Sequence, residues 1–358
     1  MASYTAVDDS EAYFQTVIYT GNGTAIGSGG LSVTFPGDTD LTRGMLWNKR
    51  RTVSVSQHDM YDSARGAQIR YYPESAYAED TGVTEAVNAF TSDGFNLGNS
   101  GGGNASGGLY AAWCWKAGGS GSANTAGSIN TTATSVDTTS GFSISTYTGN
   151  DTAGATIGHG LGAVPHFMIV KCRNAAQSWA VYHHGNTAAP ETDYLILDTA
   201  VATADAADRW NDTAPTSTLI TLGDGDQVNG SQTYVAYAWT DKQGFSKFGA
   251  YKGNGNADGP FVYTGFKPAF ILNKDTGNEA QWMIMDNKRS GYNPHNNRLY
   301  ADTNAVEEGD TDRFDILSNG FKIRTADADT NVSGSTFVYA AFAEQPFVNS
   351  NGVPCTAR

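Results

Sequence analysis

The chain repeats one short motif three times, and this repetition decides its architecture. Tyr-Thr-Gly-Asn at residues 19–22 occurs again at residues 147–150 and, as Tyr-Lys-Gly-Asn, at residues 251–254. About 90 residues after each motif comes a run of small and aromatic residues, at residues 109–115, 234–239 and 337–342. Such regular spacing indicates tandem copies of one structural unit. We therefore expect three copies of a domain of about 100 residues.

The copies set the expected domain boundaries. Repeat 1 comprises residues 13–116, repeat 2 residues 141–243 and repeat 3 residues 244–347. Residues 117–140 are rich in Gly, Ser and Thr and are expected to form a linker. Residues 1–12 are expected to form an N-terminal arm, and residues 348–358 a polar C-terminal tail.

Short strand signals recur inside each copy. Residues 142–147 (Phe-Ser-Ile-Ser-Thr-Tyr) alternate apolar and polar residues, as a half-buried strand does. The following Gly-Asn favours a turn, because both residues tolerate positive φ. Many short strands separated by turn signals are typical of β-sandwiches. We expect an all-β chain of three tandem β-sandwich, jelly-roll-like domains, each with its terminal aromatic residues in its own core.

Composition excludes several classes of function. The net charge of −14 argues against nucleic-acid binding, which needs a basic surface. No apolar stretch is long enough to insert into a membrane, and the N-terminus lacks the features of a signal peptide. The three cysteines have no disulfide or zinc spacing, and we expect Cys114 and Cys172 to be small buried residues. No cofactor or metal is expected, and the oxygen-rich residues 224–230 are interpreted as an acidic turn rather than a calcium loop.

Charged residues also recur with the repeat. An apolar run ends at Lys49, Lys171 or Lys274 in the three copies, and a Trp-bearing strand follows in repeats 2 and 3. After the next strand, Asp62 with Arg65 in repeat 1 corresponds to Asp286 with Lys288 and Arg289 in repeat 3. These groups form either structural ion pairs at strand ends or a ligand-facing cluster. Repetition favours the structural interpretation, because a dedicated ligand site needs only one copy.

Repeat 2 carries His183-His184 at the same place. Adjacent residues of a strand point to opposite faces, so the pair cannot readily share one metal ion. We expect both histidines at the surface or at a sheet edge.

One loop of repeat 3 is the preferred binding site. Sugar-binding surfaces use exposed aromatic rings for stacking, together with amide and carboxylate groups that bond hydroxyls. The predicted contact residues are Tyr292, Asn293, His295, Asn296, Asn297 and Tyr300.

Eight segments carry a resemblance to a known family: residues 12–16, 61–66, 158–162, 179–183, 265–270, 317–322, 341–347 and 356–358. They resemble segments of repeat-containing virion or tail-fibre-like proteins of tailed phages, many from marine and cyanobacterial hosts. The resemblance covers essentially the whole chain. It implies a location in the virion after assembly in the host cytoplasm, with other virion proteins as partners, but it supplies no catalytic residues.

The expected function is therefore that of a non-enzymatic virion protein. The favoured role is a receptor-binding, tail-fibre-like protein that contacts host-surface polysaccharide, as a homo-oligomer and most simply a homotrimer. The alternative is a head or tail decoration protein with a purely structural role. A polysaccharide depolymerase is less favoured, because the repeat is several-fold too long for the rung of a β-helix.

Overall fold

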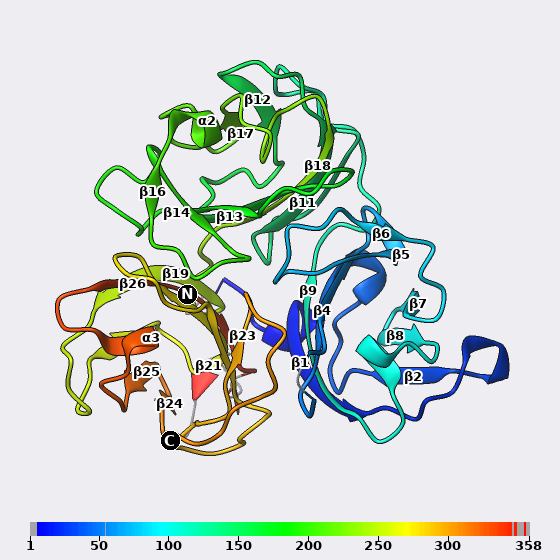
Figure 1. The fold of residues 1–358 in the computed structure, drawn as a ribbon, viewed down its shortest axis with the longest axis vertical. Coiled ribbons are helices and arrows are strands. Elements are labelled where there is room, and N and C mark those ends of the chain that lie inside the picture. Colours follow the sequence, from blue (N-terminus) through cyan, green and yellow to red (C-terminus); the bar gives the residue numbers. More distant parts are fainter. Residues whose placement is uncertain (1–5, 54, 346, 349–353, 356–358) are drawn as a thin grey trace.

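The computed structural model describes residues 6–53, 55–345, 347–348 and 354–355 of the 358-residue chain. These residues form short antiparallel strands with brief helical turns, which confirms the all-β prediction. Figure 1 shows three lobes around a common centre, coloured blue to cyan, green, and yellow to orange in chain order. Each lobe holds the strands of one repeat, and β10 from the segment 117–140 joins the sheet of repeat 2.

Repeat 1 packs a six-stranded sheet, ordered β1-β9-β3-β4-β5-β6, against a three-stranded sheet, β2-β8-β7. Buried side chains of both sheets, including Leu46, Phe95 and Cys114, fill the space between them. Its elements are β1 (Phe14–Thr20), η2 (Ile26–Ser28), β2 (Leu31–Thr34), η3 (Leu41–Arg43), β3 (Gly44–Arg50), β4 (His58–Asp62), β5 (Gly66–Tyr71), β6 (Asp80–Thr81), β7 (Val87–Thr91), β8 (Gly94–Leu97), α1 (Gly101–Asn104) and β9 (Leu109–Lys116).

Repeat 2 has a seven-stranded sheet, β10-β11-β18-β13-β14-β15-β16, and a two-stranded sheet, β12-β17. Cys172 is buried between them, so both cysteine predictions are confirmed. Its elements are β10 (Ala133–Asp137), β11 (Phe142–Thr148), β12 (Ala155–Gly158), β13 (Phe167–Cys172), β14 (Ala180–His183), β15 (Asp193–Ile196), β16 (Ala204–Asp205), α2 (Ala207–Trp210), β17 (Leu219–Leu222) and β18 (Thr233–Trp239).

The segment 117–140 differs from the expected linker, because it contains β10. This strand extends the large sheet of repeat 2 by pairing with β11 along Ala133–Asp137. Its small side chains suggested a flexible connection, yet Ser135 is buried and the Thr134 hydroxyl lies 3.2 Å from that of Ser145. Small polar residues therefore serve here as the packed face of an edge strand.

Repeat 3 has a five-stranded sheet, β19-β26-β21-β22-β23, and a three-stranded sheet, β20-β25-β24. Its elements are β19 (Ser246–Lys252), β20 (Phe261–Tyr263), β21 (Pro268–Asp275), β22 (Met283–Asp286), β23 (Leu299–Tyr300), β24 (Phe314–Leu317), β25 (Gly320–Ile323), α3 (Ala328–Asn331) and β26 (Thr336–Ala343).

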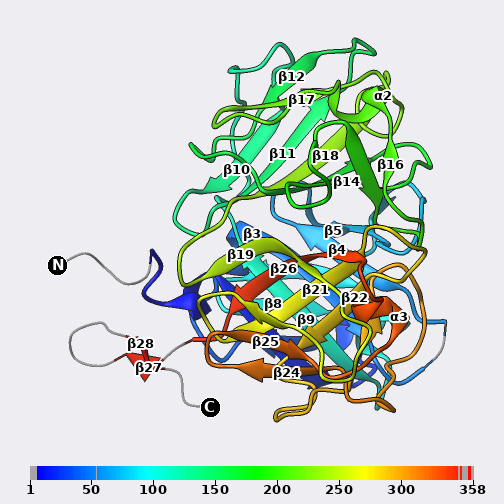
Figure 2. The same cartoon turned by 90° about the vertical axis from the view of Figure 1, so that its left-hand side faces the viewer.

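The arm and the tail lie on the same side of the molecule, as Figure 2 shows for their described parts. The arm contains η1 (Ser10–Ala12), and the Ala6 N–H donates to the Gln243 carbonyl at 2.9 Å. The Ser10 N–H donates to the side chain of Gln345 at 2.6 Å. In the tail, β27 (Phe347–Val348) pairs with β28 (Pro354–Cys355).

The repeated motif has one structural role in all three lobes. Its tyrosine donates a hydroxyl hydrogen bond of 2.6–2.8 Å to a backbone carbonyl near the end of the repeat: Tyr19 to Gly103, Tyr147 to Val228 and Tyr251 to Thr330. The next residue in each case is a buried asparagine whose side-chain oxygen accepts from the N–H of the motif asparagine: Asn104, Asn229 and Asn331. The motif therefore ties the first strand to the end of each repeat.

The motif glycine is required by close approach of two backbones. A Cβ on Gly253 would lie 2.2 Å from the Val332 carbonyl oxygen, and the other two copies are equally tight. Only glycine, which has no Cβ, permits this contact.

The inner faces of the three large sheets share one core. Equivalent residues of all three repeats meet around a small apolar cavity of about 20 Å³: Met45, Phe167 and Phe270; Trp47, Ile169 and Leu272; Trp115, Trp239 and Phe342. The terminal aromatic residues thus anchor a common core, whereas the sequence suggested a separate core for each domain. A sequence pattern shows which face of a strand is apolar but not which neighbour covers it. The repeats are arranged around a pseudo-threefold axis and share their interior.

The recurring lysines lie at the contacts between neighbouring repeats. We call these contacts seams 1–2, 2–3 and 3–1, after the repeats that they join. Each buried ammonium group donates to a backbone carbonyl of the neighbouring repeat: Lys171 to Ala76 at 2.8 Å, Lys274 to Ala200 at 3.1 Å and Lys49 to Asn304 at 3.3 Å. Burial lowers the pKa of all three to about 8. The lysines are therefore structural, and each lies in a different seam.

Candidate functional site

The recurring Asp and Arg residues also lie in the seams. In seam 1–2 the Asp62 carboxylate accepts from Arg65 at 2.6 Å and from the Tyr237 hydroxyl of repeat 2 at 2.7 Å. Glu79 then joins Arg65 to Arg173 of repeat 2, at 3.5 Å and 2.9 Å. The Asp62 and Arg65 side chains are fully buried, so these charges face the interior.

Seam 3–1 repeats this arrangement with different residues. The Asp286 carboxylate accepts from Arg289 at 2.5 Å and from the Trp113 indole of repeat 1 at 3.1 Å. Glu307 joins Arg289 to Arg51 of repeat 1, at 2.9 Å and 2.7 Å. Burial opposes ionisation of Asp286, but the Arg289 guanidinium outweighs it and lowers the pKa of this carboxyl. Both seams support the structural interpretation of the recurring charges.

Seam 2–3 is neutral at the same positions. The buried His183 imidazole lies 3.1 Å from the Tyr339 carbonyl oxygen of repeat 3. Asn186 accepts from the Thr203 hydroxyl at 2.6 Å, and the Thr203 N–H donates to the Thr276 carbonyl of repeat 3 at 2.9 Å. The prediction of a surface position was therefore wrong for His183, which fills a contact between repeats. His184 is exposed, as expected.

The predicted contact loop of repeat 3 presents few of its side chains to solvent. Tyr292 is 80% exposed. The Asn293 amide instead bonds the backbone of Ile316, donating to its carbonyl and accepting from its N–H at 2.8 Å each. His295 is buried and forms a β-bridge with Phe314.

The remaining predicted residues are also used within the fold or lie apart from Tyr292. The Asn297 amide donates to the Arg289 carbonyl at 3.1 Å, and the Tyr300 hydroxyl donates to Asp329 at 2.8 Å. Asn296 is half-buried. The six residues therefore do not converge on one cavity, and Tyr292 is the exposed aromatic ring of the set.

A second exposed aromatic feature lies on β20, where sequence reasoning did not place a site. Phe261 is 47% exposed and Tyr263 is 61% exposed, and they share the outer face because they alternate with buried Val262. The alternation Phe-Val-Tyr in the sequence was the signal that could have revealed them.

The aromatic pair is particular to repeat 3. β2, β12 and β20 are equivalent strands, since their central residues pair with Phe95, Ile220 and Phe321 in the same register. The two positions that are aromatic in β20 are Ser32 and Thr34 in β2, and Thr156 and Gly158 in β12. Repeats 1 and 2 thus show that the fold does not require aromatic residues here.

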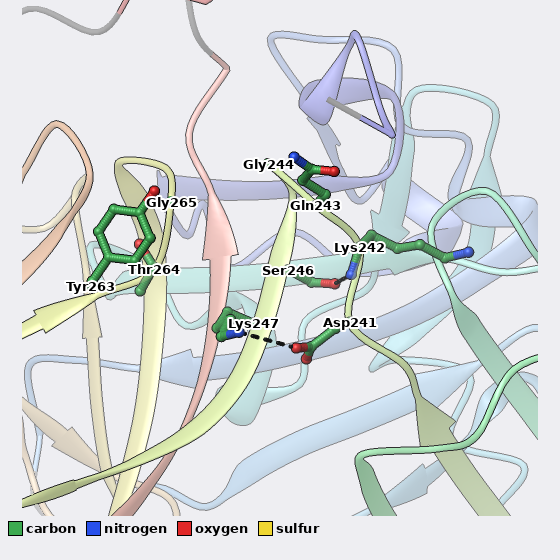
Figure 3. Close-up of a pocket in the computed structure, with 9 residues that line it drawn as sticks. All are labelled: Asp241, Lys242, Gln243, Gly244, Ser246, Lys247, Tyr263, Thr264 and Gly265. Atoms are coloured by element: carbon green, nitrogen blue, oxygen red, sulfur yellow. Dashed lines mark hydrogen bonds and ion pairs between the residues drawn. The ribbon is translucent and has the colours of Figure 1, made fainter. Parts of the chain in front are cut away.

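Tyr263 forms one wall of a cavity of about 410 Å³ at the junction of repeats 2 and 3. Figure 3 shows Tyr263 and Thr264 on one side, and Asp241 and Lys247 from the connecting segment and β19 on the other. Gln243 and Ser246 complete the polar lining, together with Lys242, Gly244 and Gly265.

The carboxylate in this cavity is held in place by its surroundings. The Asp241 side chain accepts from the Phe248 N–H at 2.8 Å, and it lies 3.5 Å from the Lys247 ammonium group. The Asp241 N–H donates to the His166 ring at 3.0 Å. The site therefore combines an acceptor, a cation, an amide and an aromatic ring, groups that bind a polyhydroxylated ligand by hydrogen bonds and stacking.

Among the described residues, no group of three or more His, Cys, Asp and Glu side chains could hold a metal ion. No helix in the described part of the chain is long and apolar enough to cross a membrane.

Comparison with known proteins gives a family without an assigned activity. No curated protein and no solved structure matches the chain. One protein family, described as a domain of unknown function (DUF7483), matches residues 9–346 and thus spans all three repeats as one unit. The chain belongs to the DUF7483 family.

Proposed function

We propose that the protein is a non-enzymatic virion protein of a tailed phage that binds a host-surface glycan through repeat 3. The observation that carries this proposal is the exposed pair Phe261 and Tyr263 beside the polar cavity of Asp241 and Lys247. The equivalent strands of repeats 1 and 2 carry polar residues or glycine at these two positions, so the fold does not require aromatic rings there. The phage setting rests on the resemblance of the sequence.

The chemistry of the cavity suits sugar hydroxyls. The flat face of Tyr263 offers a surface for the C–H groups of a sugar ring, while Asp241 accepts from hydroxyls and Lys247 and Gln243 donate to them. A single shallow site of this kind binds weakly. Many copies on one virion would raise the avidity without any new contact.

A decoration protein is the second candidate, and the shared core favours it. The three repeats close around one centre, so the chain forms a compact unit rather than a row of extended modules. The proposed homotrimer and its contacts with other virion proteins would use the outer faces, because the pseudo-threefold axis is filled by the chain's own repeats.

The test replaces the aromatic pair with the residues that repeat 1 carries at the same positions. We expect the Phe261→Ser, Tyr263→Thr double variant to bind susceptible cells at least tenfold more weakly than wild type. The measurement is binding of labelled protein to cells, together with competition against phage adsorption. The circular dichroism spectrum and Tm should be those of the wild type, since Ser and Thr occupy these positions in β2.

Tyr77 provides a matched control, because it is 61% exposed like Tyr263 but lies in repeat 1. Tyr77→Thr should leave cell binding unchanged, and Tyr292→Thr tests the loop predicted from the sequence. Absence of wild-type binding to susceptible cells would contradict receptor binding and leave decoration as the favoured role. Equal binding by wild type and the double variant would remove β20 from the site.

A further inference from the structure

Repeat 1 contains a polar pocket that the proposed glycan site does not include. Its volume is about 330 Å³, within the range of small-molecule sites. The wall is formed by the end of β3, by residues of the segment that connects β3 to β4, by β4 and β5, and by the start of α1. Its polar side chains are Arg50, Ser56, Gln57, Asp59, Arg70, Tyr72 and Ser100.

Arg50 brings an uncompensated positive charge to this pocket. It is half-buried, and its Nε atom is buried without a hydrogen-bond partner. Within the described residues, every other arginine that is not exposed lies within ion-pair distance of a carboxylate. A half-buried cation without a counterion is unusual in a chain with net charge −14, and it fits an anionic ligand.

The second arginine of the pocket is already neutralised and fixed. Arg70 bonds Asp80 at 2.8 Å and lies 3.5 Å from Asp59, and its guanidinium stacks 4.9 Å from the centre of the Tyr72 ring. The Tyr72 hydroxyl donates to Asp80 at 3.0 Å, which completes the arrangement. Arg70 and Tyr72 therefore form a rigid wall, while Arg50 carries the free charge.

Asp59 gives the same pocket an acceptor. Its side chain is almost fully buried, and its Oδ2 atom has no hydrogen-bond partner. Glu74 accepts from the His58 N–H at 3.0 Å, and burial raises the pKa of this carboxyl to about 8. The pocket thus contains one arginine without an ion pair and one carboxylate with an unbonded oxygen, and this carboxylate lies 3.5 Å from Arg70.

We propose that this pocket binds an acidic sugar, with the sugar carboxylate against Arg50 and its hydroxyl groups toward Asp59, Ser56 and Gln57. An arginine guanidinium matches the two oxygens of a carboxylate in bidentate geometry. Hydroxyl groups donate to the Asp59 carboxylate and accept from the Gln57 amide. A hexuronate carries both kinds of group on one ring.

A plain anion fits this wall less well. Sulfate offers only acceptors at neutral pH and would face the Asp59 carboxylate without a proton to donate. Inorganic phosphate keeps a P–OH donor, but it brings up to two negative charges to a pocket with one unpaired arginine and one carboxylate. Acetate satisfies Arg50 but leaves the hydroxyl-binding groups unused, and a neutral sugar leaves Arg50 unpaired. The proposal is independent of the site on β20, because the two sites lie in different repeats and share no residue.

The experiment is a titration of the full chain with sodium glucuronate, followed by ligand-observed NMR and calorimetry in buffer of low ionic strength. Glucose, sodium acetate and inorganic phosphate are titrated in parallel, and polygalacturonate tests the sugar as part of a polymer. We expect glucuronate to bind at least tenfold more tightly than the three other small ligands. Tighter binding of the polymer would identify a glycan as the source, and binding of the monosaccharide alone would identify a free sugar acid.

Arg50→Gln should weaken this binding at least tenfold. Arg43→Gln is the matched control, because Arg43 is exposed and also has no ion pair in the described residues, and it should bind as the wild type does. Neither variant should lower Tm, since neither arginine has a carboxylate partner to lose. The proposal is overturned by equal binding of Arg50→Gln and wild type, by phosphate or acetate binding as tightly as glucuronate, or by no uronate binding. None of these results depends on cell binding through β20.

Discussion

Two of the three seams are held by buried charges, and the third is held by neutral groups at the same positions. Seams 1–2 and 3–1 each use an Asp, an Arg, a bridging Glu and an Arg from the neighbouring repeat. In seam 2–3 the four equivalent residues are His183, Asn186, Thr203 and Thr276. The backbone contacts at these places are otherwise the same.

The difference indicates that the members of a buried charged network are replaced together and not one at a time. Removing one member of a buried ion pair leaves an uncompensated charge, whereas replacing all members with neutral groups removes the cost of desolvating them. The residue of the neighbouring repeat that bonds the network differs as well. Tyr237 and Trp113 donate to the Asp side chains, but repeat 3 has Ala340 at this position, so His183 bonds the backbone carbonyl of Tyr339 instead.

The largest loss of stability is expected when one charged residue is removed from a charged seam. Asp286→Ala leaves Arg289 buried with only Glu307 as a counterion, and it leaves the Trp113 indole without its acceptor. Loss of one partner from a buried pair costs about 3–5 kcal/mol. We expect a decrease of this size in the free energy of unfolding, measured by urea denaturation followed by tryptophan fluorescence.

An exposed ion pair supplies the control for this variant. Asp258 pairs with Lys322 at 2.7 Å, but its side chain is 83% exposed. Asp258→Ala should therefore leave the urea midpoint unchanged. Similar midpoints for the Asp286 and Asp258 variants would mean that burial adds nothing to the seam.

A smaller loss of stability is expected where a variant removes a side-chain hydrogen bond of one seam. The matched variant lies in the seam where the equivalent contact uses the backbone. Tyr237→Phe removes the hydroxyl that donates to Asp62 at 2.7 Å in seam 1–2. Hydrogen bonds to charged groups contribute about 1.5–3 kcal/mol, and we expect a loss in this range by the same urea measurement. Tyr339→Phe is the matched variant in seam 2–3, where His183 bonds the carbonyl of Tyr339 and not its hydroxyl. The free energy of unfolding of Tyr339→Phe should be close to that of wild type. Equal losses of stability in both variants would contradict the assignment of a side-chain contact to seam 1–2 and a backbone contact to seam 2–3.

The sequence predicted the strands better than it predicted what lies between the repeats. Alternation over residues 142–147 gave β11, since period-2 alternation depends only on the local chain. β10 was missed because its packed face consists of small polar residues. The common core was missed because apolar residues on a strand do not reveal which sheet covers them.

The candidate site was predicted even less well. Asn293 and His295 have the composition of a contact loop, but their side chains complete the fold at Ile316 and Phe314. Whether a polar residue in a loop bonds backbone or ligand depends on neighbours that are distant in sequence. Phe261 and Tyr263 were identified from the register of β20 against β25. This register shows that their equivalents in β2 and β12 are polar residues or glycine.

The last prediction concerns the difference in pH dependence between the neutral seam and its variant. Burial lowers the pKa of His183 to about 3, below the ordinary value of 6.5 that the unfolded chain would show. Between these values the unfolded state binds a proton that the folded state does not. Stability from His183 is therefore complete above pH 6.5 and decreases as the pH falls toward 3, by about 1.4 kcal/mol per pH unit.

His183→Gln should remove this contribution, so its stability should depend less steeply on pH than that of wild type between pH 6 and 4. The measurement is the free energy of unfolding at several pH values, and only the difference between wild type and variant is interpreted, because other buried groups titrate in both. His184→Gln is the control, since that exposed ring also bonds a carbonyl of repeat 3, that of Phe248 at 2.7 Å. A similar change of slope in both variants would show that burial in seam 2–3 is not the cause. A change confined to His183 would mean that the neutral seam is sensitive to acid at a position where the charged seams carry a carboxylate.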